Sequence, residues 1–175
     1  MSAPFRSVRT PRLELRPLRI DDVSGIFAIR SDREAMRFWD WPGDDDVEQT
    51  RAVVEAMLVE NAAATARYYT ATDRQGAFVG LFDLSELRTG YADLGFMVAR
   101  ESWGRGYAKE ACTALIDVAC NLGVSLLKAR IHAGNQASRH LLTNLGFQPD
   151  GTRRRIEVIP GRWIDCDSFT LEVLT

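Results

Sequence analysis

The stretch from Tyr91 to Cys120 constrains the fold more than any other part of the sequence, because it joins a strand pattern to a helix pattern through glycines. Residues 91–98 form a short apolar run that is typical of a strand. Residues 99–106 form a turn that holds Gly104 and Gly106. The apolar side chains that follow share one face of a helix, at positions 107, 111, 114, 115 and 118. The stretch therefore predicts a strand, a glycine loop and a helix that the loop opens.

This loop has the chemistry of an anion site. The first turn of a helix leaves backbone N–H groups without partners, and the helix dipole places partial positive charge there. Because glycine removes the side chains that would keep an anion away, these N–H groups can converge on a phosphate, and Arg105 can add a full charge. We interpret Gly104–Ala108 as a pyrophosphate cradle. The alternative is that Gly104 and Gly106 only make a tight turn.

Three kinds of nucleotide site contain a loop of this type. A Walker loop requires G-x-x-x-x-G-K-[S/T], which the chain lacks. A dinucleotide fingerprint requires a third glycine, where Lys109 stands, and an acidic residue near the end of the next strand, which here ends at Ile131-His132. The third kind is a coenzyme A pyrophosphate site, and the sequence favours it.

The residues from Trp103 to Ala111, WGRGYAKEA, resemble the acetyl-CoA motif of the GNAT N-acetyltransferase superfamily. The form W-G-x-G-Y-A-x-E-A is most similar to the branch that contains the ribosomal-protein N-terminal acetyltransferases RimJ and RimL. One departure is Glu101, which stands where many members carry Gln or Arg. The resemblance therefore implies that backbone N–H groups and Arg105 supply more of the phosphate binding than is usual.

A second motif of the same branch follows in the right order. Asn135-x-x-Ser138, then Leu145-Gly146-Phe147 and Asp150-Gly151, resemble its N-x-x-S…L-G-F…G pattern. The resemblance covers nearly the whole chain and is firmest from Gly90 to Gly151. It implies one acetyltransferase domain over residues 1–175 that binds acetyl-CoA beside a splayed pair of parallel strands. A homodimer is compatible with this branch, but no residue pattern decides it.

The whole chain has the pattern of an α/β (α+β) domain. Short turns join its early strands into an antiparallel meander, and the helix over residues 106–121 carries the chain to a strand that must run parallel to residues 91–98 if it pairs with them. We expect a mixed, mostly antiparallel sheet of about seven strands with helices on both faces. The predicted strands are 12–18, 67–72, 77–84, 91–98, 126–132, 154–160 and 163–173, and the other predicted helices begin at Asp21 or Asp22, span 47–64 and end at Gly146.

Composition limits the classes of partner. The formal net charge of −2 indicates a protein that does not hold nucleic acid nonspecifically. No apolar run approaches the ~20 residues of a membrane helix, and residues 1–10 have no apolar signal core, so we expect a cytoplasmic protein that does not enter a membrane. Three cysteines without metal-ligand spacing and only two histidines predict that no metal is bound.

Acetyl transfer from a thioester to an amine needs a neutral amine, donors for the oxyanion and, for the leaving thiolate, a proton. Family likeness assigns Asp93 as a candidate base for the amine, with a solvent-facing aspartate as the alternative. It places Asn135 against the pantetheine arm and makes Ser138 the candidate acid, because Leu142 stands where many members have a tyrosine. For Asn135 the alternative is helix capping. The cofactor-binding residues implied are Met97, Val98, Trp103, Gly104, Arg105, Gly106, Tyr107, Ala108, Asn135 and Ser138.

The segment Met36–Asp46, MRFWDWPGDDD, is the best candidate for the acceptor site. Trp39 and Trp41 can hold a cation by its charge, and the aspartates by Coulomb attraction. A capping run before the next helix is the alternative. Family likeness adds Asp165 to the opposite wall.

The predicted function is an acetyl-CoA-dependent N-acetyltransferase that transfers acetyl directly to a primary amine, such as the N-terminal amine of a protein. The alternatives are a small-molecule N-acetyltransferase acting on a polyamine, an aminoglycoside or an amino acid, and a noncatalytic acyl-CoA-binding module.

Overall fold

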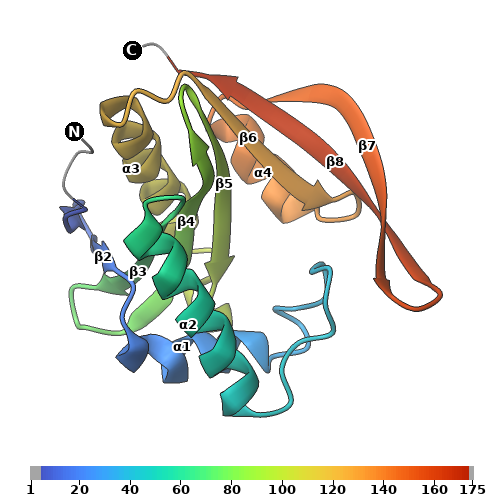
Figure 1. Cartoon of the computed structure of the whole chain (residues 1–175), viewed down its shortest axis with the longest axis horizontal. Coiled ribbons are helices and arrows are strands. Elements are labelled where there is room, and N and C mark those ends of the chain that lie inside the picture. Colours follow the sequence, from blue (N-terminus) through green and yellow to red (C-terminus); the bar gives the residue numbers. More distant parts are fainter. Residues whose placement is uncertain (1–4, 174–175) are drawn as a thin grey trace.

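An eight-stranded sheet runs through the computed structural model, which describes residues 5–173 (Figure 1). Its strand order is β1-β2-β3-β4-β5-β6-β8-β7, and every neighbouring pair is antiparallel except β5 with β6. The strands are β1 (Val8–Arg9), β2 (Leu13–Pro17), β3 (Arg67–Asp73), β4 (Phe78–Arg88), β5 (Tyr91–Val98), β6 (Leu126–His132), β7 (Gln148–Ile159) and β8 (Arg162–Glu172).

Local sequence explains where the helices begin. The Asp46 side chain accepts hydrogen bonds from the first free N–H groups of α2, and Asn135 caps α4 in the same way. Gly106 precedes α3 with a φ of 77°, a conformation that glycine adopts without steric cost. The helices are α1 (Val23–Arg30), α2 (Val47–Ala63), α3 (Tyr107–Asn121) and α4 (Gln136–Asn144), with short 3-10 turns at Ile20–Asp22 and Arg100–Ser102.

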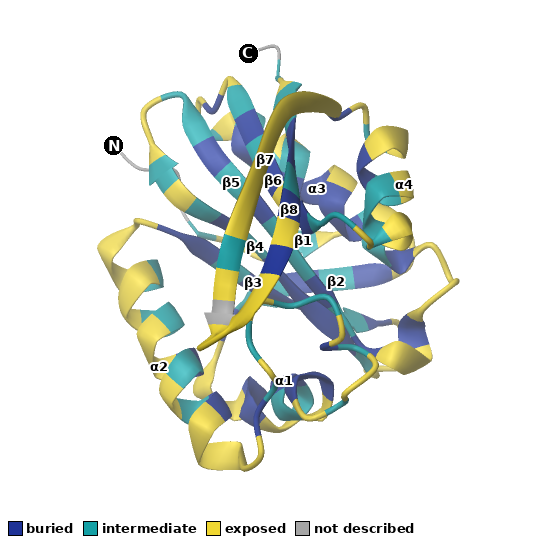
Figure 2. Cartoon of the chain, turned by 90° about the vertical axis from the view of Figure 1, so that its right-hand side faces the viewer, coloured by how far each residue is buried: buried dark blue, intermediate teal, exposed yellow. Residues whose placement is uncertain are grey.

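The helices cover both faces of the sheet, and each face has its own apolar core (Figure 1). On one face α3 contributes Ala111 and Leu115, and α4 contributes Leu142. On the other face α1 contributes Ile26, and α2 contributes Val54. The β7–β8 hairpin extends beyond these layers, and β7 is exposed along most of its length (Figure 2).

The parallel pair β5–β6 opens partway along its length. Pairing between these strands ends at Asp93 and Lys128, although β5 continues to Val98 and β6 to His132. The strands therefore diverge towards their carboxyl ends (Figure 1). This is the splayed pair that the family resemblance implied.

The predicted mixed α/β sheet with helices on both faces is confirmed, with differences at its edges. The sheet has eight strands where about seven were expected, because the short strand β1 carries too few residues to form a pattern. Strand β7 begins at Gln148 and not at Arg154, since the Pro149–Gly151 stretch that indicates a turn lies within the strand as a register shift.

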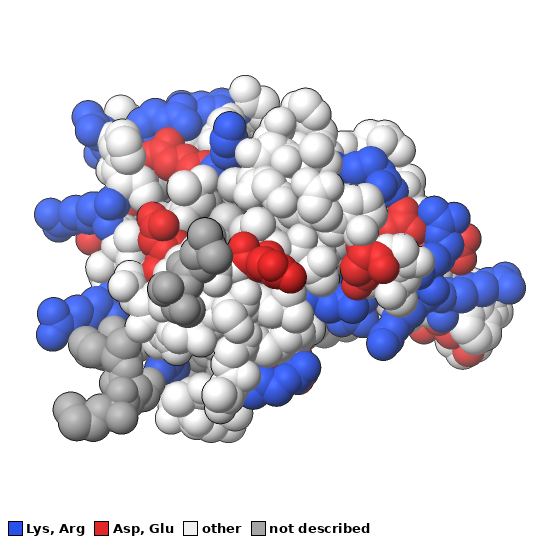
Figure 3. Space-filling view, turned by 90° about the horizontal axis from the view of Figure 1, so that it is seen from above, with Lys and Arg blue, Asp and Glu red and all other residues white. Residues whose placement is uncertain are grey.

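Charge is distributed in both signs over the surface. In the view of Figure 3, Lys and Arg side chains alternate with Asp and Glu, and cations gather at the end formed by the β7–β8 hairpin. There Arg153 pairs with Asp167 at 2.7 Å. Among the described residues, no helix combines the length and apolarity needed to cross a membrane.

Candidate active site

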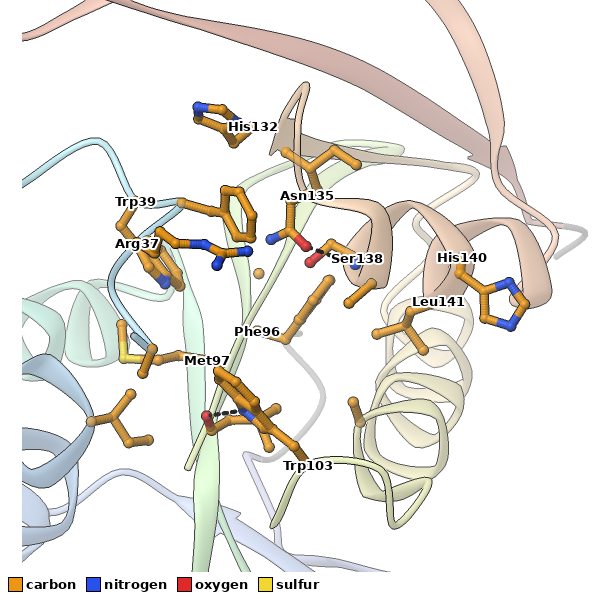
Figure 4. Close-up of a pocket in the computed structure, with 18 of the residues that line it drawn as sticks. Arg37, Trp39, Phe96, Met97, Trp103, His132, Asn135, Ser138, His140 and Leu141 are labelled. Atoms are coloured by element: carbon orange, nitrogen blue, oxygen red, sulfur yellow. Dashed lines mark hydrogen bonds between the residues drawn. The ribbon is translucent and has the colours of Figure 1, made fainter. Parts of the chain in front are cut away.

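A cavity of about 890 Å³ passes through the gap between β5 and β6 (Figure 4). Its lining begins at the first turn of α3, follows the end of β5 and the inner side of α4, and reaches the loop between α1 and α2. We call the part beside α3 and α4 the cofactor half, and the part beside the α1–α2 loop the acceptor half. The predicted residues that line the cavity are Trp39, Trp41, Met97, Val98, Trp103, Gly104, Gly106, Tyr107, Ala108, Asn135 and Ser138.

Two glycines shape the predicted cradle. Gly104 and Gly106 have φ angles of 69° and 77°, which L side chains rarely adopt. The backbone N–H groups of the first turn of α3 follow directly after them. These glycines therefore serve turn geometry and also leave the helix start open to an anion.

The basic side chain at this helix start differs from the predicted one. Arg105 lies over the ring of Tyr107, with 4.7 Å between its Cζ and the ring centroid, and it does not line the cavity. Lys109 does line it. Sequence reasoning considered Lys109 only as a missing glycine, although a lysine in the first turn of a helix beside a phosphate cradle was a usable signal.

The end of β5 forms the wall between the two halves of the cavity. Met97 is buried in the core and also lines the cavity. The indole of Trp103 donates a hydrogen bond through Nε1 to the Val98 carbonyl oxygen at 2.9 Å (Figure 4). This bond satisfies a backbone acceptor that no neighbouring strand pairs.

Helix α4 brings Asn135 and Ser138 to the cofactor half. Asn135 Oδ1 accepts a hydrogen bond from the Ser138 backbone N–H at 3.0 Å, so Asn135 is a helix cap (Figure 4). The Ser138 hydroxyl takes no part in this cap. Leu142 is fully buried in the core, and it is Leu141 that lines the cavity.

Asp93 and His132 have hydrogen-bond partners that restrict their roles. The hydroxyl of Tyr91 donates a hydrogen bond to Asp93 Oδ1, and burial together with this bond raises the pKa of Tyr91 to about 12. Asp93 does not line the cavity. His132 Nδ1 accepts a hydrogen bond from the Gly134 N–H at 2.9 Å, whereas His140 is exposed at the cavity rim.

Of the residues predicted to bind the acceptor, Trp39 and Trp41 line the cavity and Asp165 does not. The rings of Trp39 and Trp41 pack with centroids 4.7 Å apart. Asp165 does not line the cavity, although its neighbours Ile164 and Cys166 do, because alternate residues of β8 point to opposite faces.

The aspartates before α2 hold the acceptor loop in place. Asp44 is buried and forms two hydrogen bonds with the Arg30 guanidinium, at 2.6 and 2.8 Å. The Thr50 hydroxyl donates a third bond to Asp44. Asp46 accepts hydrogen bonds from the N–H groups at the start of α2. Its contacts are therefore those of a helix cap, which was the alternative prediction for this segment.

Two arginines of the acceptor half were not among the predicted site residues. Arg37 points into the cavity towards Asn135 (Figure 4), and its guanidinium pairs with Glu34 at 3.0 Å. Arg130 lines the cavity from β6 and is exposed. Arg37 lies within the predicted acceptor segment, but only the aromatic and acidic residues of that segment were considered, and only the fold brings Arg130 to the same site.

The comparisons with known proteins agree with this geometry. A family model described as acetyltransferase (GNAT) domain matches residues 12–148. The uncharacterized N-acetyltransferase p20 of Bacillus licheniformis is 29% identical over 172 residues, which cover 95% of this chain and 96% of that protein. The L-methionine sulfoximine/L-methionine sulfone acetyltransferase of Pseudomonas aeruginosa is 26% identical over 164 residues, or 91% of this chain and 94% of that protein.

The solved structure of the ribosomal alpha-N-protein acetyltransferase RimL in complex with coenzyme A has a TM-score of 0.83 and 18% sequence identity. It covers 99% of this chain and 98% of that chain, so the resemblance to RimL is confirmed at the level of the fold. The chain belongs to the GNAT acetyltransferase family, and it is an N-acetyltransferase that uses acetyl-CoA.

Proposed function

We propose that the protein transfers acetyl directly from acetyl-CoA to a primary amine, with both substrates bound in one ternary complex. The observation that carries this proposal is the continuity of the cavity, which joins the start of α3 to the aromatic loop. A thioester is already activated, so attack by a neutral amine needs no covalent enzyme intermediate. Cys166 lines the acceptor half, but burial raises the pKa of its thiol and disfavours the thiolate that a covalent route requires.

Backbone N–H groups of β5 are the proposed oxyanion donors. The Ala99 N–H donates to the Val79 carbonyl oxygen at 2.9 Å, so every second residue of β5 turns its N–H towards β4. Phe96 and Val98 alternate with these residues and turn their N–H groups towards β6, which pairs with β5 only as far as Asp93. Donors that the sheet holds in place at the cavity wall suit a developing oxyanion.

The residues at the start of α4 complete the proposed chemistry. Asn135 contacts the pantetheine arm, and the Ser138 hydroxyl donates a proton to the departing thiolate. Both residues line the cofactor half, which supports these roles. Leu142, which stands where many members have a tyrosine, is buried in the core, so that residue does not reach the reaction.

We propose further that the acceptor carries a carboxylate beside its amine, as an amino acid does. Arg37 and Arg130 line the acceptor half and offer charge-assisted hydrogen bonds. Asp44 and Asp46, which would attract a polyamine, are engaged in holding the loop, and Glu34, which lines this half together with Asp40, pairs with Arg37. The Pseudomonas aeruginosa relative is named for amino-acid derivatives, whereas RimL makes a protein N-terminus the alternative acceptor.

Calorimetry of acetyl-CoA binding tests the cofactor half. Gly104→Asp places a negative charge in the cradle, and we expect at least a ten-fold loss of affinity. Gly123→Asp is the matched control, because Gly123 has a φ of 76°, open space around it and a place at the far end of α3. Equal losses in the two variants, or binding that neither variant changes, would count against the cradle.

Turnover with paired acceptors tests the acceptor half. Free amino acids and their amides present the same amine, but only the acids carry a carboxylate. We expect Arg130→Gln to lower kcat/KM about ten- to a hundred-fold for the acids, which corresponds to ~1.5–3 kcal/mol for a hydrogen bond to a charged group, and to spare the amides. Turnover restricted to peptides or to spermidine would overturn the carboxylate proposal.

A further inference from the structure

Asp83 lies on β4 directly opposite Gly95 of β5. Its carboxylate occupies the space that a Cβ atom on Gly95 would need, so it lies against the main chain of β5. Gly95 lines the cavity, and Met97 on the same side of β5 lines it too and packs in the same core cluster as Trp39 and Trp41. Asp83 itself does not line the cavity, but its carboxylate lies directly against Gly95, which does, on the face of the sheet that carries the acceptor loop. Gly95 belongs to the part of β5 that has left β6, whereas Asp93 belongs to the part that still pairs with it.

Titratable side chains from four elements interact electrostatically with Asp83. They come from α2, β3, β5 and α3, and they are Glu60, Tyr68, Asp93 and Cys112. Glu60 accepts a hydrogen bond from the Tyr68 hydroxyl at 2.7 Å, and Asp93 accepts one from Tyr91. The Cys112 thiol is buried, and burial raises its pKa. Glu60 and Asp93 both disfavour ionisation of Asp83.

These surroundings change the basicity of Asp83. Burial raises the pKa of this carboxyl to about 7, helped by Asp93 and Glu60 and partly opposed by a hydrogen bond with Ser85. An aspartate with an ordinary pKa of about 3.9 is a weak base at neutral pH. A carboxylate whose pKa is close to the operating pH is well matched to general-base work.

We propose that Asp83, in place of Asp93, is the base that accepts a proton from the acceptor ammonium. This inference rests on the function proposed above. One proton moves from the ammonium nitrogen, through one bridging water beside Gly95, to an Asp83 oxygen, and the freed lone pair forms the N–C bond to the thioester carbonyl. The C–S bond then breaks, and the thiolate sulfur receives a second proton that the nitrogen releases through Ser138 or water. Asp83 returns its proton to solvent.

The pH dependence of kcat at saturating acceptor tests the assignment. We expect the wild type to lose rate below an apparent pKa near 7, and Asp83→Asn to lose about a hundred-fold in kcat together with this acid limb. Asp93→Asn removes a carboxylate neighbour, so it should keep the limb and shift it to lower pH. An acid limb that persists in Asp83→Asn and disappears in Asp93→Asn would overturn the proposal.

Ser85→Ala gives a second test that does not remove the base. The hydrogen bond from Ser85 lowers the pKa of Asp83, so its loss should move the acid limb to higher pH with little change in the plateau rate. A limb that stays in place would contradict the assignment, even if Asp83→Asn fails to fold.

Two readouts keep this proposal separate from the function on which it rests. The affinity for acetyl-CoA, measured by calorimetry, should be equal in the wild type and in Asp83→Asn. A wild-type protein that does not bind acetyl-CoA would instead contradict the proposed function. The folded state holds the Asp83 proton up to about pH 7, whereas the unfolded state releases it near 3.9. Stability from this group is therefore lost between about pH 4 and 7, and Asp83→Asn should not show that loss in denaturant titrations.

Discussion

Asn135 and Ser138 lie at the start of α4, and their contacts allow a role in stability to be distinguished from a role in catalysis. Ser138 takes part in the cap only through its backbone N–H. Replacing Ser138 by Ala therefore leaves the cap intact, and we expect kcat to fall about ten-fold or more while the midpoint of thermal unfolding stays constant. An unchanged kcat would assign the proton of the leaving thiolate to water.

Asn135→Ala is the complementary change. It removes the cap, and we expect the free energy of unfolding to fall by about 1 kcal/mol. Asn135→Ser retains a capping oxygen and is the control for this loss. A KM for acetyl-CoA that rises in both variants, with stability lost only in the alanine variant, would separate pantetheine contact from capping.

The residues that the sequence predicted well are those whose conformation the chain itself specifies. Gly104 and Gly106 identify a backbone that other residues rarely adopt, and Asn135 precedes a helix start, so both signals are local. Asp83 was missed because its environment is created by the register of β4 against β5. No pattern within one strand reveals which carboxylate lies opposite a glycine on the next.

The loop between α1 and α2 owes its shape to a buried ion pair. Asp44→Asn would leave the Arg30 guanidinium, which also lies over the Trp41 ring at 4.8 Å, with a weaker partner in a buried position. We expect a loss of about 3–5 kcal/mol in the free energy of unfolding, since breaking one side of a buried pair leaves an uncompensated charge. Urea titration measures it.

The neighbouring residue Asp45 provides the matched control, because it is exposed. Asp45→Asn makes the same chemical change one residue away, and stability should stay within about 0.5 kcal/mol. If the two variants lost equal stability, the pair between Arg30 and Asp44 would not be what holds this loop. The KM for the acceptor should also rise in Asp44→Asn alone.

Among the helices and strands, the sequence predicted best those in which one hydrophobic periodicity continues along most of the element. The helix after Gly106 and the strands of the central meander have clear patterns, and each was found close to its observed bounds. Element ends were less predictable. Strand β4 continues to Arg88 past a positive φ at Glu86, which lies where the register of β4 against β5 shifts between Ser85 and Arg88.

The molecule as a whole consists of two parts of one sheet, β1 to β5 and β6 to β8. They are joined by parallel pairing at Tyr91–Asp93 with Leu126–Lys128. Cofactor in the gap would cover the N–H groups of Phe96 and Val98, and we expect acetyl-CoA to slow their hydrogen exchange more than that of β2 and β3. Mass spectrometry of exchanged peptides measures this, and uniform slowing across the sheet would indicate only global stabilisation by the ligand.

The cavity has a consequence for how such a protein changes over evolutionary time. Its cofactor half comes from residues 94–109 and 135–144, whereas its acceptor half comes mainly from residues 29–41 and 130–132 and from the β7–β8 hairpin. Drift in the second set alters which amine is accepted without disturbing the pyrophosphate cradle. One lineage can therefore keep its acetyl donor and acquire new acceptors by exchanging a loop and a hairpin.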